Sequence, residues 1–157
     1  MANVVMKGKD AISASLAECF ITIDGTRYNF MQAINLEARM EKSKTEVAIL
    51  GKTGKSNKSV GWTGTGSATF HYNTSVFRKA MKAYKDSGMD FFFDMQITNE
   101  DPTSSVGKQV IILKDCNLDS VLLTAFDADG EILEDDFDFT FEDWEMPNEF
   151  TMLQGMA

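Results

Sequence analysis

The sequence predicts an α+β protein that is mostly β: an antiparallel sandwich or partial barrel with one flanking helix at about residues 74–87. Three observations carry this prediction. Several segments alternate polar and apolar residues, which is typical of strands with one buried face. An Asp24-Gly25 pair joins two of them and is a strong signal for a hairpin. Only one segment has the apolar spacing of a helix. Strands on both sides of one helix favour this class.

The first third of the chain is predicted to form hairpin strands. Residues 18–31 read as a strand, the Asp24-Gly25 turn and a second strand. Residues 33–41 alternate cleanly, which predicts a strand. One side of it carries Ile34, Leu36, Ala38 and Met40, and the other carries Asn35, Glu37, Arg39 and Glu41. A further short strand is predicted over residues 45–51. Residues 51–61 are rich in Gly, Lys and Ser, so an extended exposed loop is expected at about residues 42–61.

Residues 62–72 also alternate, but with small residues on the apolar side. Gly64, Gly66 and Ala68 share a face with Trp62 and Phe70. The other face carries hydroxyl groups and a histidine: Thr63, Thr65, Ser67, Thr69 and His71. Glycine within a strand usually marks a bend or the close approach of another group. We therefore expect another part of the protein to pack tightly across these glycines.

A helix is predicted immediately after this strand. Asn73 or Thr74 can cap its beginning, and Gly88 suits its end. The apolar stripe is formed by Phe77, Ala80, Met81 and Tyr84. The basic residues Arg78, Lys79, Lys82 and Lys85 lie largely off this stripe. The pattern predicts a helix with one buried face and one basic face.

The rest of the chain is predicted to return to strands. Three are expected over residues 90–98, 108–116 and 118–126, followed by a tight hairpin turn at residues 127–130 and a last strand over residues 131–144. In that strand Phe137, Phe139 and Phe141 point one way, and Asp136, Asp138, Thr140 and Glu142 point the other. The last strand is therefore expected to have one dry and one wet face.

Length and composition indicate one domain over residues 1–157. A chain of this size buries roughly two thirds of the surface of its unfolded form. No apolar run reaches the roughly 18 residues that a membrane helix needs, so the isolated subunit is expected not to insert into membranes. The N-terminus lacks the apolar core of a signal peptide, which predicts synthesis in the cytoplasm. Cys19 and Cys116 have no metal-site spacing and are expected to be buried, reduced thiols.

Charge is distributed unevenly along the sequence, whose net charge is −9. Residues 51–89 carry seven basic side chains and one acidic one, whereas residues 90–157 carry two basic and seventeen acidic ones. Such polarity indicates that different faces of the fold meet different partners. Residues 127–145 alone hold ten carboxylates and no basic residue. A metal site, a mimic of nucleic acid, and a surface to which nucleic acid does not adhere all fit this segment.

The sequence offers no specific catalytic or cofactor motif. Residues 127–136 resemble a calcium loop only loosely, because an EF-hand register puts Ala125 at its first position and Asp136 at its last. Residues 50–56 lack the first glycine of a phosphate-binding loop, since Ile49 stands there, and no helix pattern follows. His71 is the only histidine and has no evident catalytic partners. We expect a protein that is not an enzyme and that binds no metal or other cofactor.

The order of these segments resembles a known family. Residues 61–70, residues 73–96 and residues 133–150, together with the early Asp-Gly hairpin and residues 41–51, are similar to the tail-tube proteins of the PBSX-like prophage family. These are relatives of the tube subunits of contractile phages and of R-type bacteriocins. The resemblance covers nearly the whole chain and concerns its strand pattern rather than a catalytic signature. It implies a structural subunit that forms hexameric rings, which stack into a hollow tube for DNA passage or membrane puncture.

The resemblance also suggests roles for particular residues. The polar strand faces would line the channel: Glu37, Arg39, Glu41, Thr63, Thr65, Ser67, Asp136, Asp138 and Glu142. An extended loop of family members reaches the neighbouring subunit or ring, and the corresponding lysines here are Lys42, Lys44, Lys52, Lys55 and Lys58. The basic helix face, formed by Arg78, Lys79, Lys82 and Lys85, would face the sheath. A carboxylate-lined channel would let DNA slide, because protein–DNA binding depends on cations that neutralise the phosphates.

The partners implied are further copies of the chain, together with sheath, baseplate and tail-terminator proteins. DNA would be a passing, weakly interacting polymer. The subunit would be made in the host cytoplasm and end in the tail of a virion or a phage-like particle. Two other classes remain open from the residues alone: an acidic DNA mimic that inhibits a DNA-binding enzyme, and a β-sandwich that binds carbohydrate or calcium. Phage, bacteriocin and defective prophage particles would use the same tube, so the sequence does not distinguish them.

Overall fold

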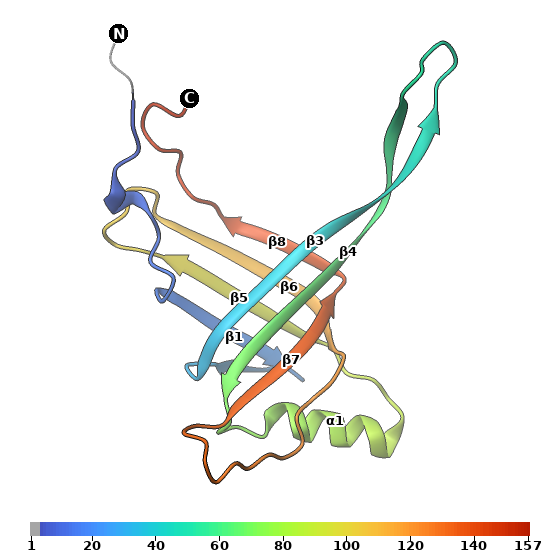
Figure 1. The fold of residues 1–157 in the computed structure, drawn as a ribbon. Coiled ribbons are helices and arrows are strands. Elements are labelled where there is room, and N and C mark those ends of the chain that lie inside the picture. Colours follow the sequence, from blue (N-terminus) through green and yellow to red (C-terminus); the bar gives the residue numbers. More distant parts are fainter. Residues whose placement is uncertain (1–3) are drawn as a thin grey trace. The chain divides into compact units, whose positions relative to one another are not determined.

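The computed structural model describes residues 4–157 and contains mostly antiparallel strands with one α-helix (Figure 1). The elements are η1 (Gly8–Asp10), β1 (Ala17–Ile23), β2 (Thr26–Asn29), β3 (Ala33–Ala48), β4 (Lys55–His71), α1 (Val76–Ser87), β5 (Phe93–Glu100), β6 (Lys108–Leu118), β7 (Glu134–Phe141) and β8 (Asp143–Asn148). The strand order is β2-β1-β5-β6-β7-β4-β3, with β8 paired to β6. This order is an open path that begins at β2 and ends at β3. The predicted fold class is confirmed.

The chain divides into two compact units, each built from segments far apart in the sequence. The first unit comprises residues 1–31, 92–115 and 143–157, of which residues 4 onward are described. The second comprises residues 32–91 and 116–142. Neither unit is a contiguous stretch of sequence, and the single domain over residues 1–157 stays a prediction.

The first unit contains the early hairpin that the sequence predicts. Asp24 and Gly25 both have positive φ, 50° and 78°, as the tight turn between β1 and β2 requires. Strand β1 pairs antiparallel with β2 on one side and with β5 on the other. The buried residues of this unit form its core: Cys19, Ile21, Ile23, Phe30, Phe93, Met95, Val106, Val110 and Leu113. Burial raises the pKa of the Cys19 thiol to about 11, so this cysteine is a protonated, free thiol, as expected.

The second unit is a sheet in which β3, β4 and β7 lie side by side, and the last residues of β6 pair with β7. Its aromatic core connects the sheet to the helix. Phe77 of α1 lies with its ring centroid 6.1 Å from that of Phe70 and 4.9 Å from that of Phe137. Gly88 ends the helix in the left-handed conformation, and its N–H donates to the Tyr84 carbonyl oxygen. The predicted helix is therefore confirmed, although it begins two residues later than expected, at Val76, and its N-cap residue is Ser75 rather than Asn73 or Thr74.

Three of the predicted strand and loop boundaries are wrong. The short strand at residues 45–51 is not separate, because β3 continues without a break to Ala48. Residues 42–48 and 55–61 belong to paired strands, so the expected loop at 42–61 is the outer part of a hairpin whose turn is only residues 49–54. Residues 118–126 do not form a strand up to residue 126, since β6 ends at Leu118 and irregular backbone follows to residue 133. No helix in residues 4–157 is long and apolar enough to cross a membrane.

Candidate functional site

The predicted channel-lining residues lie together on one face of the β3–β4–β7 sheet. The register pairs Glu37 with Ser67, and Ser67 with Asp138. It equally pairs Arg39 with Thr65, and Glu41 with Thr63. Because side chains directly opposite each other in a sheet point to the same side, these pairs form continuous polar rows. The full face comprises Asn35, Glu37, Arg39, Glu41, Thr63, Thr65, Ser67, Thr69, Asp136, Asp138, Thr140 and Glu142.

This polar face is anionic, exposed and ordered by local hydrogen bonds. The Arg39 guanidinium donates to Glu37 Oε1 on the same strand, and this bond raises the pKa of Arg39. Thr69 Oγ1 donates to Asp136 Oδ1 across the β4–β7 pair at 2.8 Å. The face contains five carboxylates, at positions 37, 41, 136, 138 and 142, against the single cation of Arg39. An open depression of about 360 Å³ lies on it, beside Glu37, Arg39 and Asp138. The face is therefore a wetted, negatively charged surface.

The opposite face of the same sheet is closed by aromatic rings. A Cβ atom at Gly64 would overlap the Phe141 ring, and one at Gly66 would overlap the Phe139 ring and lie 2.8 Å from the Glu37 carbonyl oxygen. Phe139 is only 1% exposed. The predicted close approach at these glycines is confirmed, and the groups that approach are the phenylalanines of β7. The sheet thus has an apolar side, covered at these glycines by phenylalanine rings, opposite its polar side.

The lysines predicted for ring stacking lie on the β3–β4 hairpin beyond the end of β7. Strand β7 pairs with β4 only from His71 to Gly64, whereas β3 and β4 remain paired to Ala48 and Lys55. Figure 1 shows this two-stranded part extending away from the three-stranded part. We call residues 42–61 the lysine hairpin; its basic residues are Lys42, Lys44, Lys52, Lys55 and Lys58, all exposed. Leu50 at its turn is fully exposed.

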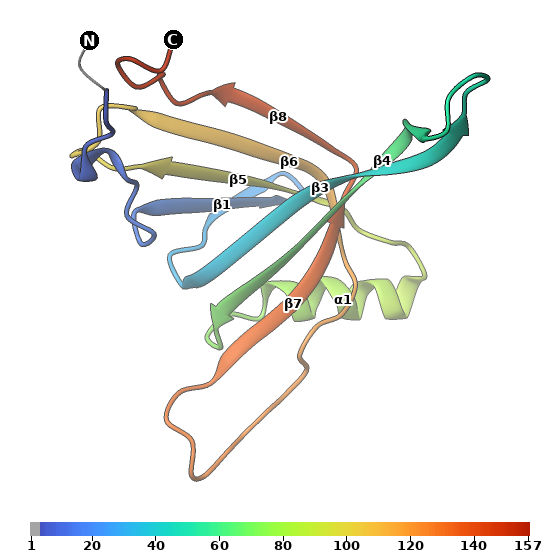
Figure 2. The same cartoon turned by 45° about the horizontal axis from the view of Figure 1, so that its top comes forward.

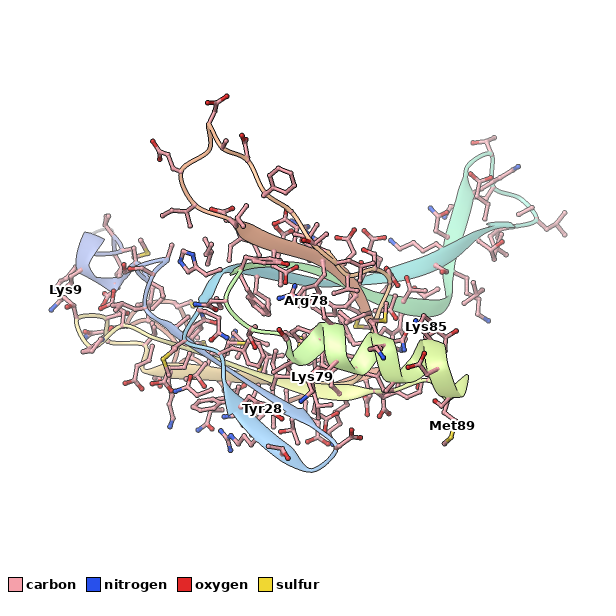
Figure 3. All side chains as sticks on the ribbon, turned by 90° about the horizontal axis from the view of Figure 1, so that it is seen from below. Lys9, Tyr28, Arg78, Lys79, Lys85 and Met89 are labelled. Carbon is pink, nitrogen blue, oxygen red and sulfur yellow. The ribbon has the colours of Figure 1, made fainter. Side chains whose placement is uncertain are left out.

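The helix lysines are exposed, but Arg78 is not part of a basic outer face. Lys79, Lys82 and Lys85 lie on the surface of α1, and Lys82 and Lys85 form ion pairs with Asp86. The Arg78 side chain, only 16% exposed, instead forms an ion pair of 2.8 Å with Asp135 of β7. In Figure 3, Arg78 lies on the side of the helix nearer β7. The prediction that Arg78 faces the sheath is wrong, because Arg78 forms internal contacts.

Arg78 is the centre of a polar cluster that sequence reasoning missed. Its guanidinium also donates to the backbone oxygens of Leu122 and Thr74, and it stacks over the Tyr72 ring at 4.4 Å from the centroid. Asp135 Oδ1 is buried and has no hydrogen-bond partner among the described residues. A signal was present in the sequence, because Asp135 is in phase with Phe137 and the other phenylalanines of its strand. A carboxylate on a dry face needs a cation.

The segment before β7, residues 119–133, differs from the predicted hairpin. We call it the acidic loop, since it contains Asp119, Asp127, Asp129 and Glu131 and no basic residue. Its turn is real: Gly130 N–H donates to the Asp127 carbonyl oxygen and Asp129 N–H to the Asp127 side chain. The flanking residues are not paired strands, however, and Gly130 does not have positive φ. Within residues 4–157, no three His, Cys, Asp or Glu side chains are grouped so that they could hold a metal ion.

Comparison with known proteins places this arrangement in a family. A family model described as phage tail tube protein matches residues 4–148. The PBSX phage-like element protein XkdM of Bacillus subtilis (strain 168) is 34% identical over 148 residues, which cover 94% of this chain and 98% of XkdM.

Solved structures of low sequence identity share the fold. A chain of the anti-feeding prophage baseplate matches with a TM-score of 0.62 and 10% identity over 93% of this chain and 97% of its own length. The SPP1 tail tube matches with a TM-score of 0.59 and 10% identity over 94% and 81%, respectively. The chain therefore belongs to the phage tail tube protein family, a family of structural proteins.

Proposed function

We propose that the chain forms hexameric rings that stack into a hollow tube, and that the polar face of the β3–β4–β7 sheet lines its channel. The observation that carries this proposal is the one-sided character of that sheet. Its polar face contains five exposed carboxylates and a row of hydroxyl groups, whereas its other face is closed by Phe139 and Phe141. A sheet with one dry and one wet side suits a wall between a protein layer and a water-filled bore.

The charge of this face suits the passage of DNA. Duplex DNA carries about one negative charge per 1.7 Å of axis, and its non-specific binding to proteins depends on lysine and arginine that replace counterions. The polar face offers Arg39 as its only cation, and Arg39 already donates a hydrogen bond to Glu37. Six such faces around a bore would repel a polyanion from every side. DNA would therefore slide through the tube without adhering to its wall.

The outer edge of β3 supports assembly through the sheet. Strand β3 is 16 residues long and stands at one end of the strand order, so no described strand pairs with its other side. A long free edge presents unpaired N–H and C=O groups that another chain can bind. Closing a sheet across neighbouring copies would remove this edge, as barrels do. Another copy of the subunit is the partner that fits this edge.

Further tail proteins are the partners proposed outside the tube. The exposed lysines of α1, Lys79, Lys82 and Lys85, form the candidate contact with a sheath, now without Arg78. Baseplate and terminator proteins would cap the two ends of the tube, in line with the fold shared with a chain of the anti-feeding prophage baseplate. The subunit would be made in the host cytoplasm and assembled there into the tail.

Electron microscopy of the concentrated, purified protein tests the assembly directly. We expect stacked rings with sixfold symmetry and a central hole. Particles that stay monomeric under all conditions, including those with added baseplate components, would contradict the proposal. They would instead favour an acidic DNA mimic, which acts as a small soluble protein.

The lining is tested by reversing its charge. Replacing Asp136, Asp138 and Glu142 by lysine should leave tubes intact, because all three side chains are exposed. Six copies in each ring would then present cations to DNA, so the tubes should bind duplex DNA at low salt and release it as salt is raised. The matched control is the neutral variant Asp136→Asn, Asp138→Asn and Glu142→Gln, which should show weak binding at most. Lysine tubes that bind no DNA, or particles that eject DNA at the normal rate, would exclude these strands from the channel wall.

A further inference from the structure

The second unit has oppositely charged ends. The lysine hairpin stands at one end of the β3–β4–β7 sheet, and its five lysines outnumber its single acidic residue, Glu46, which pairs with Lys55 at 3.6 Å. The acidic loop joins β7 at the other end of that sheet, where Glu134 pairs with His71. Figure 2 shows the hairpin turn and the acidic loop extending in opposite directions from this sheet. A subunit with a cationic end and an anionic end is complementary to a second copy placed head to tail.

Both ends also expose apolar side chains. In the acidic loop Phe126 is 93% exposed, and Leu123 and Ile132 of the same loop are exposed too. At the turn of the lysine hairpin Leu50 is fully exposed, and Ile49 is partly so. Large apolar side chains that cluster in exposed segments and are rimmed by charges are typical of protein–protein contacts. The exposed residues at the two ends are therefore complementary in two respects, in apolar character and in opposite charge.

The acidic loop is held in place at both of its ends. Arg78 and the Tyr72 hydroxyl donate to the backbone oxygens of Leu122 and Leu123, each at 3.2 Å. The Tyr72 backbone N–H donates to the Leu133 carbonyl oxygen, also at 3.2 Å. The Arg78–Asp135 ion pair in turn fixes Arg78 to the start of β7. A loop anchored at both ends loses less conformational freedom when it binds, so it is preorganised as a docking site.

We propose that the acidic loop is the docking site for the lysine hairpin of the next copy along the tube. Lys52, Lys55 and Lys58 of one copy meet Asp127, Asp129 and Glu131 of the other, and Leu50 packs against Phe126. The contact is heterologous, so each copy offers one free hairpin and one free loop, and stacking repeats without limit. This inference rests on the proposed tube, and it names the partner surface of the lysine hairpin.

The test uses two charge-reversed variants. Neither should form tubes alone, whereas their mixture should form tubes. The hairpin variant carries Lys52→Glu, Lys55→Glu and Lys58→Glu. The loop variant carries Asp127→Lys, Asp129→Lys and Glu131→Lys. Each alone brings like charges together at every ring junction, so the mass of protein in sedimentable tubes should fall at least about tenfold relative to the unmodified chain. In an equal mixture each hairpin meets a loop of opposite charge, and tubes should return to within about twofold of the original yield.

The mixture also serves as the control for folding, because variants that had lost their fold could not restore assembly together. Either variant forming tubes alone at the original yield would overturn the inference. A mixture that assembles no better than its separate components would also overturn it. The proposed function is judged separately, on the unmodified chain. If that chain forms tubes while the mixture fails, only the docking site is wrong; if it never stacks, the proposed function fails and the docking site with it.

Discussion

The β3–β4 hairpin has an inner half, residues 33–41 and 62–71, and an outer half, the lysine hairpin of residues 42–61. The two halves differ in what stabilises them. In the inner half, β7 adds a third strand, and Phe139 and Phe141 fill the space above Gly64 and Gly66. In the outer half, β3 and β4 pair only with each other, and nearly every side chain is exposed. An isolated two-stranded ribbon is marginally stable in water. The inner half is thus specified by the fold of the subunit itself, whereas the outer half gains little burial within the subunit.

This contrast indicates where the sequence is constrained by folding and where by assembly. Substitutions in the inner half should act on the free energy of unfolding of the subunit. Substitutions in the outer half should leave that free energy nearly unchanged and act on the formation of tubes. Measurements of both quantities on the same variants would therefore separate the two halves.

The largest effect on unfolding is expected at the ion pair that ties α1 to the inner end of β7. Replacing Arg78 by leucine leaves the Asp135 carboxylate buried without its cation, which typically costs about 3–5 kcal/mol. It also removes the hydrogen bonds to Leu122 and Thr74. Urea unfolding of the monomeric subunit measures this loss. The matched control is Lys82→Met, which breaks an exposed pair with Asp86 on the same helix and should change the free energy by less than about 0.5 kcal/mol. Equal effects of the two variants would refute the role of the buried pair.

The next effect is expected at the glycines beneath the β7 phenylalanines. In Gly66→Ala the new methyl group would overlap the Phe139 ring and the Glu37 backbone, and forced repacking of this kind costs about 1–3 kcal/mol. The matched control is Gly61→Ala in the outer half, where a Cβ meets nothing within 4 Å. Gly61→Ala should raise stability by up to about 0.5 kcal/mol, because alanine lowers the conformational entropy of the unfolded chain. Denaturation midpoints that shift in the same direction for both variants would contradict the distinction between the halves.

The strands of the inner half and their polar faces could be predicted from the sequence, because the alternation of polar and apolar residues is visible within each strand. The polar rows of β3, β4 and β7 could be assigned to one side of each strand before their register was known. Asp24-Gly25 likewise indicates a turn, and Gly88 a helix end, because these residues readily adopt positive φ. The pairing of Glu37 with Ser67 and of Ser67 with Asp138 could not be predicted in this way, since register depends on contacts between distant segments.

The wrong predictions arise where local composition and tertiary contacts disagree. Residues 42–61 look like a loop because Gly, Lys and Ser have low strand propensity, yet the pairing that begins in the inner half continues along both strands to Ala48 and Lys55. Residues 119–126 look like a strand because they are apolar, yet their backbone is held by Arg78 and Tyr72 rather than by a neighbouring strand. The position of Arg78 off the apolar stripe of the helix predicts a surface residue, although the phase of Asp135 on its strand already indicates a buried cation.

The smallest effect on unfolding is expected for the outermost part of the hairpin, where the effect on assembly should be large. Deleting Thr53–Lys58 removes two residues of the turn and four residues of β4 but no buried side chain. Residues 45–52 then close a loop of eight residues instead of six, whose extra entropic cost is about 0.3 kcal/mol. We expect a folded monomer whose urea midpoint matches that of the unmodified chain within error and which forms no stacked tubes. If tubes formed normally, stacking would depend on other surfaces; if the monomer unfolded, the outer half would belong to the fold after all. A normal urea midpoint together with the absence of tubes would show that these residues act in a contact between copies and not in the folding of the subunit.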